Sequence, residues 1–248
     1  MGELTDRVKT IYITRKKQLI SKFWPVKFAP KTKFIILSKP RTGSTLLHTL
    51  LNSHPNIYSY GETLRRVGVN KTGFTLNNEV FKDHPKSIMA VGLKIFYHYF
   101  EDNNFNQFFD EVRRNQHIKI IHLLRNNDLD TFISLKNAEK TNQWSIEKDL
   151  PYSQIRSLNP DINEFKEYLK YSNNLQQSIT QAFEKHQTLD ISYEMLVKNQ
   201  KICLNEIQDF LGVPQKKLFT LLKKQSTEDY NYVSNYAELL EIYKSQKR

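Results

Sequence analysis

The stretch KFIILSKPRTGSTLLHTLLNSHP, residues 33–55, joins a strand pattern, a polar turn and a helical pattern. Its apolar run at 34–37 is followed by a turn that holds two cations, Lys39 and Arg41. A short apolar run bounded by turn residues predicts a parallel strand that is buried on both faces. Leucines spaced three and four apart then predict an amphipathic helix over 44–53.

The turn between these two elements has the composition of an anion site. The first N–H groups of a helix lack intrahelical partners and lie at the positive end of the helix dipole, so they bind phosphate or sulfate readily. Gly43 lets a ligand approach the backbone closely, and Arg41 offers a planar fork to a tetrahedral anion. Three hydroxyl groups add further donors: Thr42, Ser44 and Thr45. An ordinary helix cap would account for only one of these hydroxyls.

The octapeptide PRTGSTLL at 40–47 differs from the common nucleotide loops. It lacks the first glycine and the lysine of G-x-x-x-x-G-K-[ST], and the chain contains no G-x-G-x-x-G. It resembles instead the phosphosulfate loop of sulfotransferases, which use 3′-phosphoadenosine-5′-phosphosulfate (PAPS) and read P-[KR]-[ST]-G-[ST]-[ST] after the first strand. The NSHP sequence at 52–55 also resembles the bacterial carbohydrate and tyrosylprotein branches of that family.

A second strand-to-helix unit, IKIIHLLRNNDLDTFISLKNA at 118–138, has a similar arrangement. Arg125 follows an apolar strand pattern, and Ser134 lies nine residues later in a helical pattern. The pair resembles the family's 3′-phosphate motif, an arginine after a strand and a serine eight or nine residues on. The resemblance implies that both residues hold the phosphate that distinguishes PAPS from simpler adenylates. A surface arginine and an ordinary helical serine are the alternative reading.

Two C-terminal stretches extend the resemblance. LDISYEMLVKNQKICLNEIQDFLGVP at 189–214 resembles the family's strand-to-helix unit and implies that Tyr193 stacks near the adenine. A half-buried strand tyrosine is the alternative. KKQSTEDYNYVSNYAELL at 223–240 resembles the segment that closes over the donor, with Lys224 as a candidate 3′-phosphate contact. The R-K-G loop of the cytosolic members is absent, so the preceding lysine remains an alternative.

Glu62 is the predicted general base for the acceptor. It follows a short strand pattern at 57–60, close to the anion turn, and a carboxylate can take the proton of a poor nucleophile. In the branches that this chain resembles, a glutamate stands at this point, and Lys94 matches a family lysine beside the sulfuryl group. His48 and His98 are rival bases, because cytosolic members use a histidine.

Alternating strand and helix patterns predict an α/β fold in one domain, a P-loop-like parallel sheet flanked by helices on both faces. Ligands of such sheets bind at the carboxyl ends of the strands, where both motifs lie. Strands are expected at 33–38, 57–60, 88–96, 118–124 and 188–193. Helices are expected at 44–53, 102–115, 126–140, 161–187, 194–211 and 214–224. Residues 61–87 and 139–160 lack periodicity and predict loops over the site.

The composition restricts the class of protein. A chain of 248 residues with 39% hydrophobic residues can form one sizeable core. The single cysteine, Cys203, excludes a disulfide framework and lies in an amphipathic pattern typical of a buried thiol. The seven histidines show no zinc-binding spacing. No signal-peptide core and no membrane-span run occurs, which predicts a cytoplasmic protein without a transmembrane segment.

The positive charge is concentrated near the N-terminus. The net charge is +11, and residues 1–33 hold nine Lys or Arg against two acidic residues. This predicts a basic N-terminal helical segment at 1–32, followed by a sulfotransferase domain at 33–248. We expect the segment to be a solvated helix that packs on the domain, and no nucleic-acid partner. A highly charged donor and an acidic acceptor would also account for a basic protein.

The resemblance to sulfotransferases implies an enzyme that moves the sulfuryl group of PAPS in line to an acceptor hydroxyl and leaves PAP. The acceptor would be a carbohydrate or a small natural product. Arg41 and Lys94 would stabilise the group in transfer, and the resemblance implies no metal. The alternatives are a nucleotide-dependent kinase with a degenerate P-loop and a non-catalytic module that binds PAP or nucleic acid. O- versus N-sulfation and oligomeric state stay open, and aromatic residues of the two predicted loops can stack a sugar or an alkaloid equally well: Phe74, Trp144 and Tyr152.

Overall fold

The computed structural model describes residues 8, 12–17, 19, 26–64, 75–146, 156–222 and 230–246. In this part of the chain, one parallel sheet has the strand order β2-β3-β1-β4-β5. Its strands are β1 (Thr32–Ser38), β2 (Ile57–Ser59), β3 (Ala90–Phe96), β4 (Ile118–Leu124) and β5 (Thr188–Ser192). The predicted α/β class with a parallel sheet is confirmed.

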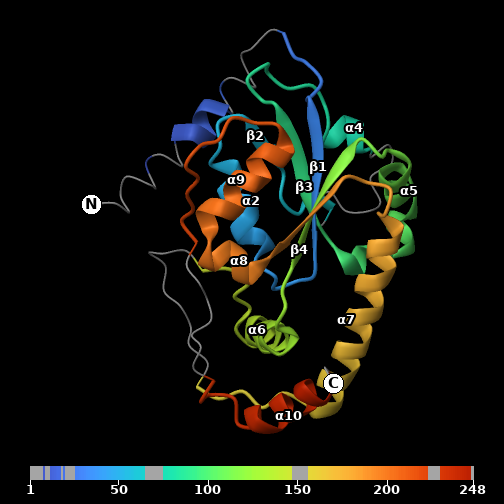
Figure 1. Ribbon diagram of the computed structural model, residues 1–248, viewed down its shortest axis with the longest axis vertical. Coiled ribbons are helices and arrows are strands. Elements are labelled where there is room, and N and C mark those ends of the chain that lie inside the picture. The colour runs from blue at the N-terminus through green and yellow to red at the C-terminus, as the bar shows by residue number, and fades with distance from the viewer. Residues whose placement is uncertain are drawn as a thin grey trace.

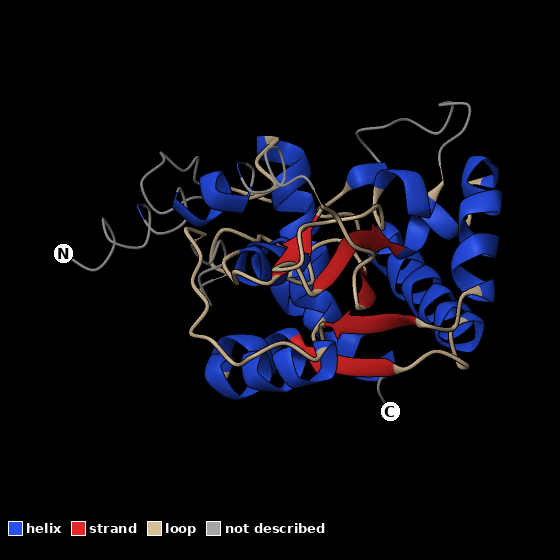
Figure 2. Ribbon diagram, turned by 90° about the horizontal axis from the view of Figure 1, so that it is seen from above, coloured by secondary structure: helices blue, strands red, loops and turns tan. Residues whose placement is uncertain are grey.

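Helices cover both faces of the sheet (Figures 1 and 2). One face carries α2 (Ser44–Asn52), α8 (Tyr193–Lys198) and α9 (Gln200–Leu211). The other carries α4 (Leu76–Glu79), α5 (Asn106–Arg114) and α7 (Ile162–Ala182). The remaining elements are α6 (Asp128–Thr141), α10 (Tyr236–Gln246) and two 3-10 turns, η1 (Tyr97–Phe100) and η2 (Asn103–Phe105).

The central strand β1 explains why its sequence is a continuous apolar run. Phe34 and Ile36 point into the core below α2 and α9, and Ile35 and Leu37 point into the core below α5 and α7. All four side chains are at most 2% exposed. Successive side chains of a strand alternate between the two faces of the sheet. A strand with helices on both faces is therefore apolar on both sides.

The chain leaves neighbouring strands β1 and β4 toward opposite sides of the sheet. Ser38 of β1 pairs with Leu123 of β4, so the two carboxyl ends lie side by side. The chain after β1 forms α2, beside β2 and β3, whereas the chain after β4 forms α6 and later β5. Such a switch point opens a crevice for ligands. Beyond it lie α6, α7 and α10 (Figure 1), which share a third apolar cluster.

The prediction of a helix at 214–224 is wrong for residues 214–222, the part that the structure describes, because their backbone is irregular. Backbone N–H groups of this segment bond to side chains of other elements instead. Lys216 N donates to Gln208 Oε1 at 2.7 Å, and Phe219 N donates to Ser53 Oγ at 3.0 Å. Because distant side chains satisfy these donors, the segment does not need the helical ladder that its local pattern favours.

Other expected elements occur with shifted boundaries, but α4 lies inside the loop expected at 61–87, and α10 was not among the expected helices. The helix expected at 194–211 divides at Asn199 into α8 and α9, and α5 begins only after the 3-10 turn η2. Cys203 is buried at 2% exposure, as predicted, and burial raises the pKa of its thiol. Parts of both predicted loops, including Phe74 and Tyr152, lie outside the described residues. Among the described helices, none has the length and apolar character needed to cross a bilayer.

Candidate active site

The turn from β1 into α2 has an unusual backbone. Arg41 has a φ of 66° and Gly43 has a φ of 85°, so two residues of one tight turn are left-handed. Gly43 is the N-cap of α2, and its carbonyl accepts the N–H of Leu47 at 3.0 Å. No described side chain caps the N-terminus of α2, and its first turn holds no acid. The first N–H groups of α2 therefore suit an anion.

The three hydroxyl groups of the turn have different surroundings. Thr42 is fully buried, and its hydroxyl donates to the carbonyl of Lys39 at 2.8 Å. Thr42 therefore shapes the turn from within rather than presenting its hydroxyl to a ligand. Ser44 is buried at 3% exposure. Thr45 Oγ1 accepts a hydrogen bond from Lys94 Nζ at 2.9 Å, which connects α2 with β3.

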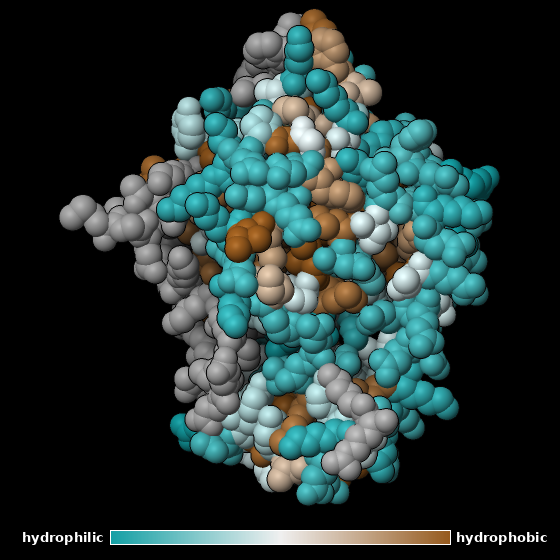
Figure 3. All heavy atoms as spheres, viewed as in Figure 1, coloured by the Kyte–Doolittle hydropathy of each residue, from teal (hydrophilic) through white to brown (hydrophobic). Residues whose placement is uncertain are grey.

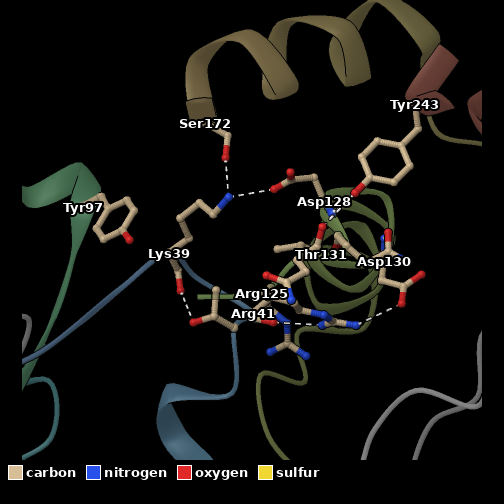
Figure 4. A network of polar contacts seen from close by, with 12 residues as sticks. Lys39, Arg41, Tyr97, Arg125, Asp128, Asp130, Thr131, Ser172 and Tyr243 are labelled. Carbon is tan, nitrogen blue, oxygen red and sulfur yellow. Dashed lines mark hydrogen bonds and ion pairs between the residues drawn. The ribbon is translucent and has the colours of Figure 1, made fainter. Parts of the chain in front are cut away.

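The two predicted anion motifs meet in space (Figure 4). Arg41 Nε donates to Ser134 Oγ at 3.0 Å, and Arg125 Nη1 donates to the carbonyl of Arg41 at 2.9 Å. Arg125 also lies 3.6 Å from Asp130 Oδ2. Arg41 Nη1 further donates to the carbonyl of Trp144 at 2.6 Å. Two guanidinium groups thus converge where the ends of β1 and β4 meet, although 84 residues separate them in sequence.

Lys39, the other cation of the turn, points away from this cluster (Figure 4). Its ammonium is buried and donates to Asp128 Oδ1 at 2.7 Å and to Ser172 Oγ at 2.8 Å. Asp128 begins α6 and Ser172 belongs to α7. Lys39 therefore joins the turn to two helices and is not part of the anion-binding surface.

Tyr193 lies directly against the turn. A Cβ on Gly43 would be 2.5 Å from Tyr193 Cδ2, so the ring occupies the space that a side chain would need. The guanidinium of Arg125 lies over the same ring, 4.8 Å from its centroid. The first residue of α8 is thus placed between the two motifs, beside the crevice where the nucleotide is expected.

Glu62 and Lys94 form an ion pair next to the turn. Lys94 Nζ is 2.6 Å from Glu62 Oε1, with side-chain exposures of 3% and 25%. Burial lowers the pKa of Lys94, and Glu62 opposes this shift. The left-handed Gly61, with a φ of 67°, sets the direction of Glu62, and its carbonyl accepts the N–H of Lys94 at 2.9 Å. The predicted base therefore lies beside a cation that contacts the α2 turn through Thr45.

The two rival histidines have different positions. His48 Nδ1 hydrogen-bonds Ser59 Oγ at 2.7 Å, and its ring lies against Gly61. His98 is exposed in η1 after β3, and its ring packs against Phe96 and Tyr99 with centroids 5.6 and 4.5 Å away. His48 thus supports the β2 turn from behind, whereas His98 belongs to an aromatic surface beside Lys94.

Several residues of the site were not singled out from the sequence. Asp128 and Asp130 are examples, yet they hold Lys39 and Arg125. Ser172 and Tyr243 carry no recognisable signal, because only the packing of α7 and α10 brings them here. Lys224 lies outside the described residues. Among the described residues, no group of three His, Cys, Asp or Glu could hold a metal ion.

This chain is similar to several known proteins. The family model "Sulfotransferase domain" matches residues 31–248. Nodulation protein H of Rhizobium tropici is 31% identical over 224 residues, covering 83% of this chain and 87% of that protein. Nodulation protein H of Rhizobium meliloti (strain 1021) is 29% identical over 225 residues, covering 85% and 90%. The crystal structure of mouse sulfotransferase SULT7A1 complexed with PAP aligns with 14% identity and a TM-score of 0.43, over 93% of this chain and 70% of that one. The match of the family model over nearly the whole described domain shows that this chain belongs to the sulfotransferase family.

Proposed function

We propose that this PAPS-dependent sulfotransferase sulfates a hydroxyl group of a carbohydrate, with Glu62 as the general base. The observation that carries the proposal is the contact chain from Glu62 through Lys94 to Thr45. Lys94 Nζ lies 2.6 Å from Glu62 Oε1 and 2.9 Å from Thr45 Oγ1. A carboxylate, a cation and the start of α2 thus surround one point at the carboxyl ends of β1 and β3.

The donor would lie across the two motifs. Backbone N–H groups at Gly43, Ser44 and Thr45 would hold the 5′-phosphosulfate, together with Arg41. Arg125 and Ser134 would hold the 3′-phosphate, since their side chains lie at the adjacent strand end. The bond between Arg41 and Ser134 would then be exchanged for bonds to donor oxygens. The sequence also assigns Lys224 to the 3′-phosphate, which stays a prediction.

The transfer step needs one proton acceptor and stabilisation of charge on the donor. The acceptor oxygen attacks sulfur and forms the new S–O bond, and its proton passes to the Glu62 carboxylate. The bond between sulfur and the phosphate oxygen breaks, and its electron pair leaves with PAP. Lys94 and Arg41 would stabilise the negative charge that builds up on the transferred and departing oxygens.

An aromatic surface beside Glu62 supports a carbohydrate acceptor. Phe96 lies 4.9 Å below Lys94 Nζ, and the rings of His98 and Tyr99 continue from it. Trp144, 44% exposed, is a further candidate, because its backbone carbonyl accepts a hydrogen bond from Arg41 Nη1. Aromatic faces with polar edges contact the C–H faces of a sugar while polar groups bind its hydroxyls.

Three further expectations belong to this proposal. The catalytic domain would begin near residue 33, after a basic N-terminal segment. The protein would act in the cytoplasm and would need no nucleic-acid partner. The reaction would run without a metal, so activity in excess EDTA should equal activity in its absence.

Thermal denaturation with nucleotides tests the donor site. Stabilisation grows with the ratio of ligand concentration to its dissociation constant. PAP (3′,5′-ADP) should raise the melting temperature clearly, and 5′-AMP should raise it weakly. The reason is that Arg125 and Ser134 would bind the 3′-phosphate, which 5′-AMP lacks. Equal shifts from both nucleotides would contradict this site.

Release of PAP from PAPS, measured against a panel of acceptors, tests the acceptor class. The panel should contain oligosaccharides, aryl alcohols and amines at equal concentration. We expect turnover with an oligosaccharide to exceed the rest by at least about tenfold, the discrimination that a few well-placed contacts provide. Preferred turnover of an aryl alcohol would assign the aromatic surface to a small natural product instead.

A further inference from the structure

Lys17 is a buried cation from outside the family domain. The family model begins at residue 31, and the helical residues 12–17 precede it. In this helix Arg15 and Lys16 are exposed, but Lys17 is only 8% exposed. Its Nζ donates to the carbonyl of Asn52 at 2.7 Å and to the carbonyl of Ile57 at 2.6 Å. Lys17 is therefore not part of a solvated basic face.

The two carbonyls belong to the connection between α2 and β2. Asn52 is the last residue of α2 and Ile57 is the first residue of β2. The last carbonyls of a helix lack intrahelical partners and carry partial negative charge, and the last turn of α2 holds no basic residue of its own. β2 is a three-residue edge strand that pairs only with β3 in the described sheet. Lys17 thus supplies two hydrogen bonds to the ends of this connection.

The same connection leads to Glu62 through a series of contacts. The side chain of Asn52 bonds both backbone groups of Ser59, at 2.8 and 2.9 Å. Ser59 Oγ bonds His48 Nδ1 at 2.7 Å, and the ring of His48 lies against Gly61. Glu62 follows immediately. The position of the carboxylate therefore depends on how β2 is held against α2.

Burial lowers the pKa of Lys17 to about 7. A neutral amine still has two N–H groups, one for each carbonyl, so the contact does not require the charged form.

We propose that Lys17 is a positioning residue for the sulfuryl transfer, because it holds the connection between α2 and β2 and thereby the place of Glu62. The inference rests on the proposed role of Glu62 as the base. The N-terminal segment would then act within the molecule, as a fixed support for the acceptor side of the site. The donor side, built from Arg125 and Ser134, would not depend on it.

The test compares Lys17→Met and Lys17→Gln with Lys16→Met in the full chain. Methionine keeps the apolar stem without donors, and the shorter glutamine reaches at most one carbonyl. Lys16 is the control because it is exposed, with its ammonium 5.7 Å from the ring of Tyr12. The measured quantities are kcat, KM for each substrate, the dissociation constant of PAP and the pH profile of kcat.

We expect Lys17→Met to lower kcat about tenfold, since misplacing a reacting group by less than about 1 Å has effects of this order. The kcat of Lys17→Gln should lie between those of Lys17→Met and the wild type. The dissociation constant of PAP should stay within about twofold, because a misplaced base does not touch the donor. The acid limb of the kcat profile should move in Lys17→Met, because the surroundings of the base change. Lys16→Met should behave as wild type in all four measurements.

An unchanged kcat in Lys17→Met, with or without a lower melting temperature, would make Lys17 a purely structural residue and overturn the proposal. Equal losses of kcat and PAP affinity would do the same. If Lys17→Met does not fold, Lys17→Gln decides alone, by the same criterion of reduced kcat at unchanged PAP binding. Glu62→Gln is measured in parallel. Full activity in that variant would refute the proposed base, whereas an inactive Glu62→Gln beside a fully active Lys17→Met would refute only the role of Lys17.

Discussion

Gly43 meets two separate requirements at the residue scale. Its φ of 85° is a conformation that only glycine adopts at little cost, and the ring of Tyr193 fills the space of its missing side chain. The first requirement concerns the local turn. The second concerns a residue 150 positions later in the sequence, which packs there only in the folded protein.

We predict that Gly43→Ala lowers PAP affinity by at least about tenfold, because the new methyl group must displace the Tyr193 ring at the donor crevice. Gly212→Ala is the matched control. Gly212 also has a positive φ, 69°, but a Cβ there would meet nothing within 4 Å. Both variants should lose about 1 kcal/mol of stability from backbone strain, and only Gly43→Ala should lose PAP binding in a calorimetric titration. Similar PAP affinities in the two variants would contradict the contact.

We predict that Glu62→Gln lowers turnover by about a hundredfold to ten-thousandfold, because it removes the proton acceptor and keeps the shape of the side chain. PAP affinity should barely change. Steady-state kinetics with PAPS and the best acceptor measure the first quantity, and a PAP titration measures the second. His98→Ala is the companion variant, since its exposed ring lies in the aromatic surface beside Lys94. A fully active Glu62→Gln with an inactive His98→Ala or His48→Ala would move the base to a histidine.

At the scale of elements, α6 is held by hydroxyl groups from the C-terminal segment 230–246. Tyr243 donates to the carbonyl of Asn126 at 2.9 Å and accepts the N–H of Asp128 at 3.2 Å. Tyr230 donates to Asp130 Oδ1 at 2.5 Å, and Tyr232 accepts from Asn137 Nδ2 at 2.7 Å. These bonds hold the start and one side of the helix that carries Ser134 and follows Arg125. The C-terminal segment therefore supports the predicted 3′-phosphate site indirectly.

We predict that Tyr243→Phe destabilises the protein by about 1–3 kcal/mol, because two hydrogen bonds to partly buried backbone groups are lost. The affinity for PAP should fall about two- to tenfold, while the affinity for 5′-AMP should change less, since only PAP carries the 3′-phosphate. Tyr236→Phe is the control, because the ring of Tyr236 stacks on Tyr230 at 4.6 Å but its hydroxyl makes no hydrogen bond to a described residue. Equal effects on PAP and 5′-AMP binding would show that α6 does not transmit the change to the 3′-phosphate site.

At the scale of the whole molecule, the interior holds several neutral histidines. His54, His84 and His122 are at most 5% exposed. Burial lowers the pKa of all three, and for His84 to about 4. His54 shows why the neutral form is needed. Its Nε2 faces the carbonyl of Pro214 at 2.8 Å, and its Nδ1 accepts the N–H of Asn56 at 2.9 Å, a bond that a second ring proton would remove.

We predict that the free energy of unfolding falls as the pH is lowered from 7 to 5. In this range the three histidines take up protons near pH 6.5 in the unfolded chain and at lower pH in the folded chain, so acid favours the unfolded state. His84 alone should contribute a loss of about 2 kcal/mol between pH 7 and pH 5. Urea denaturation at several pH values measures the slope. His84→Gln should flatten it and His117→Gln, at an exposed position, should not; an unchanged slope in His84→Gln would contradict the lowered pKa.

The sequence alone determined the fold class and the two anion motifs, because these depend on local order. The spacing at which apolar residues recur distinguishes a strand from a helix within about a dozen residues. A turn with glycine and hydroxyl groups between a strand and a helix can be recognised in the sequence for the same reason. So can an arginine at the end of a buried strand. Both motifs follow parallel strands, so the sequence could also place them at one edge of the sheet. The structure then brought Arg41, Arg125, Ser134 and Tyr193 together there.

Only the tertiary structure decided which groups face the crevice and which support it. Lys39 and Arg41 are two residues apart and look alike in the sequence. Lys39 nevertheless turns toward Ser172, 133 residues away, because that helix offers a buried ammonium its partners. The irregular segment after α9 and the buried Lys17 have the same explanation. In both, hydrogen-bond donors bind acceptors that lie 8 to 166 residues away in the sequence. A buried polar group must find a partner wherever the fold provides one, and no local pattern records where that partner lies.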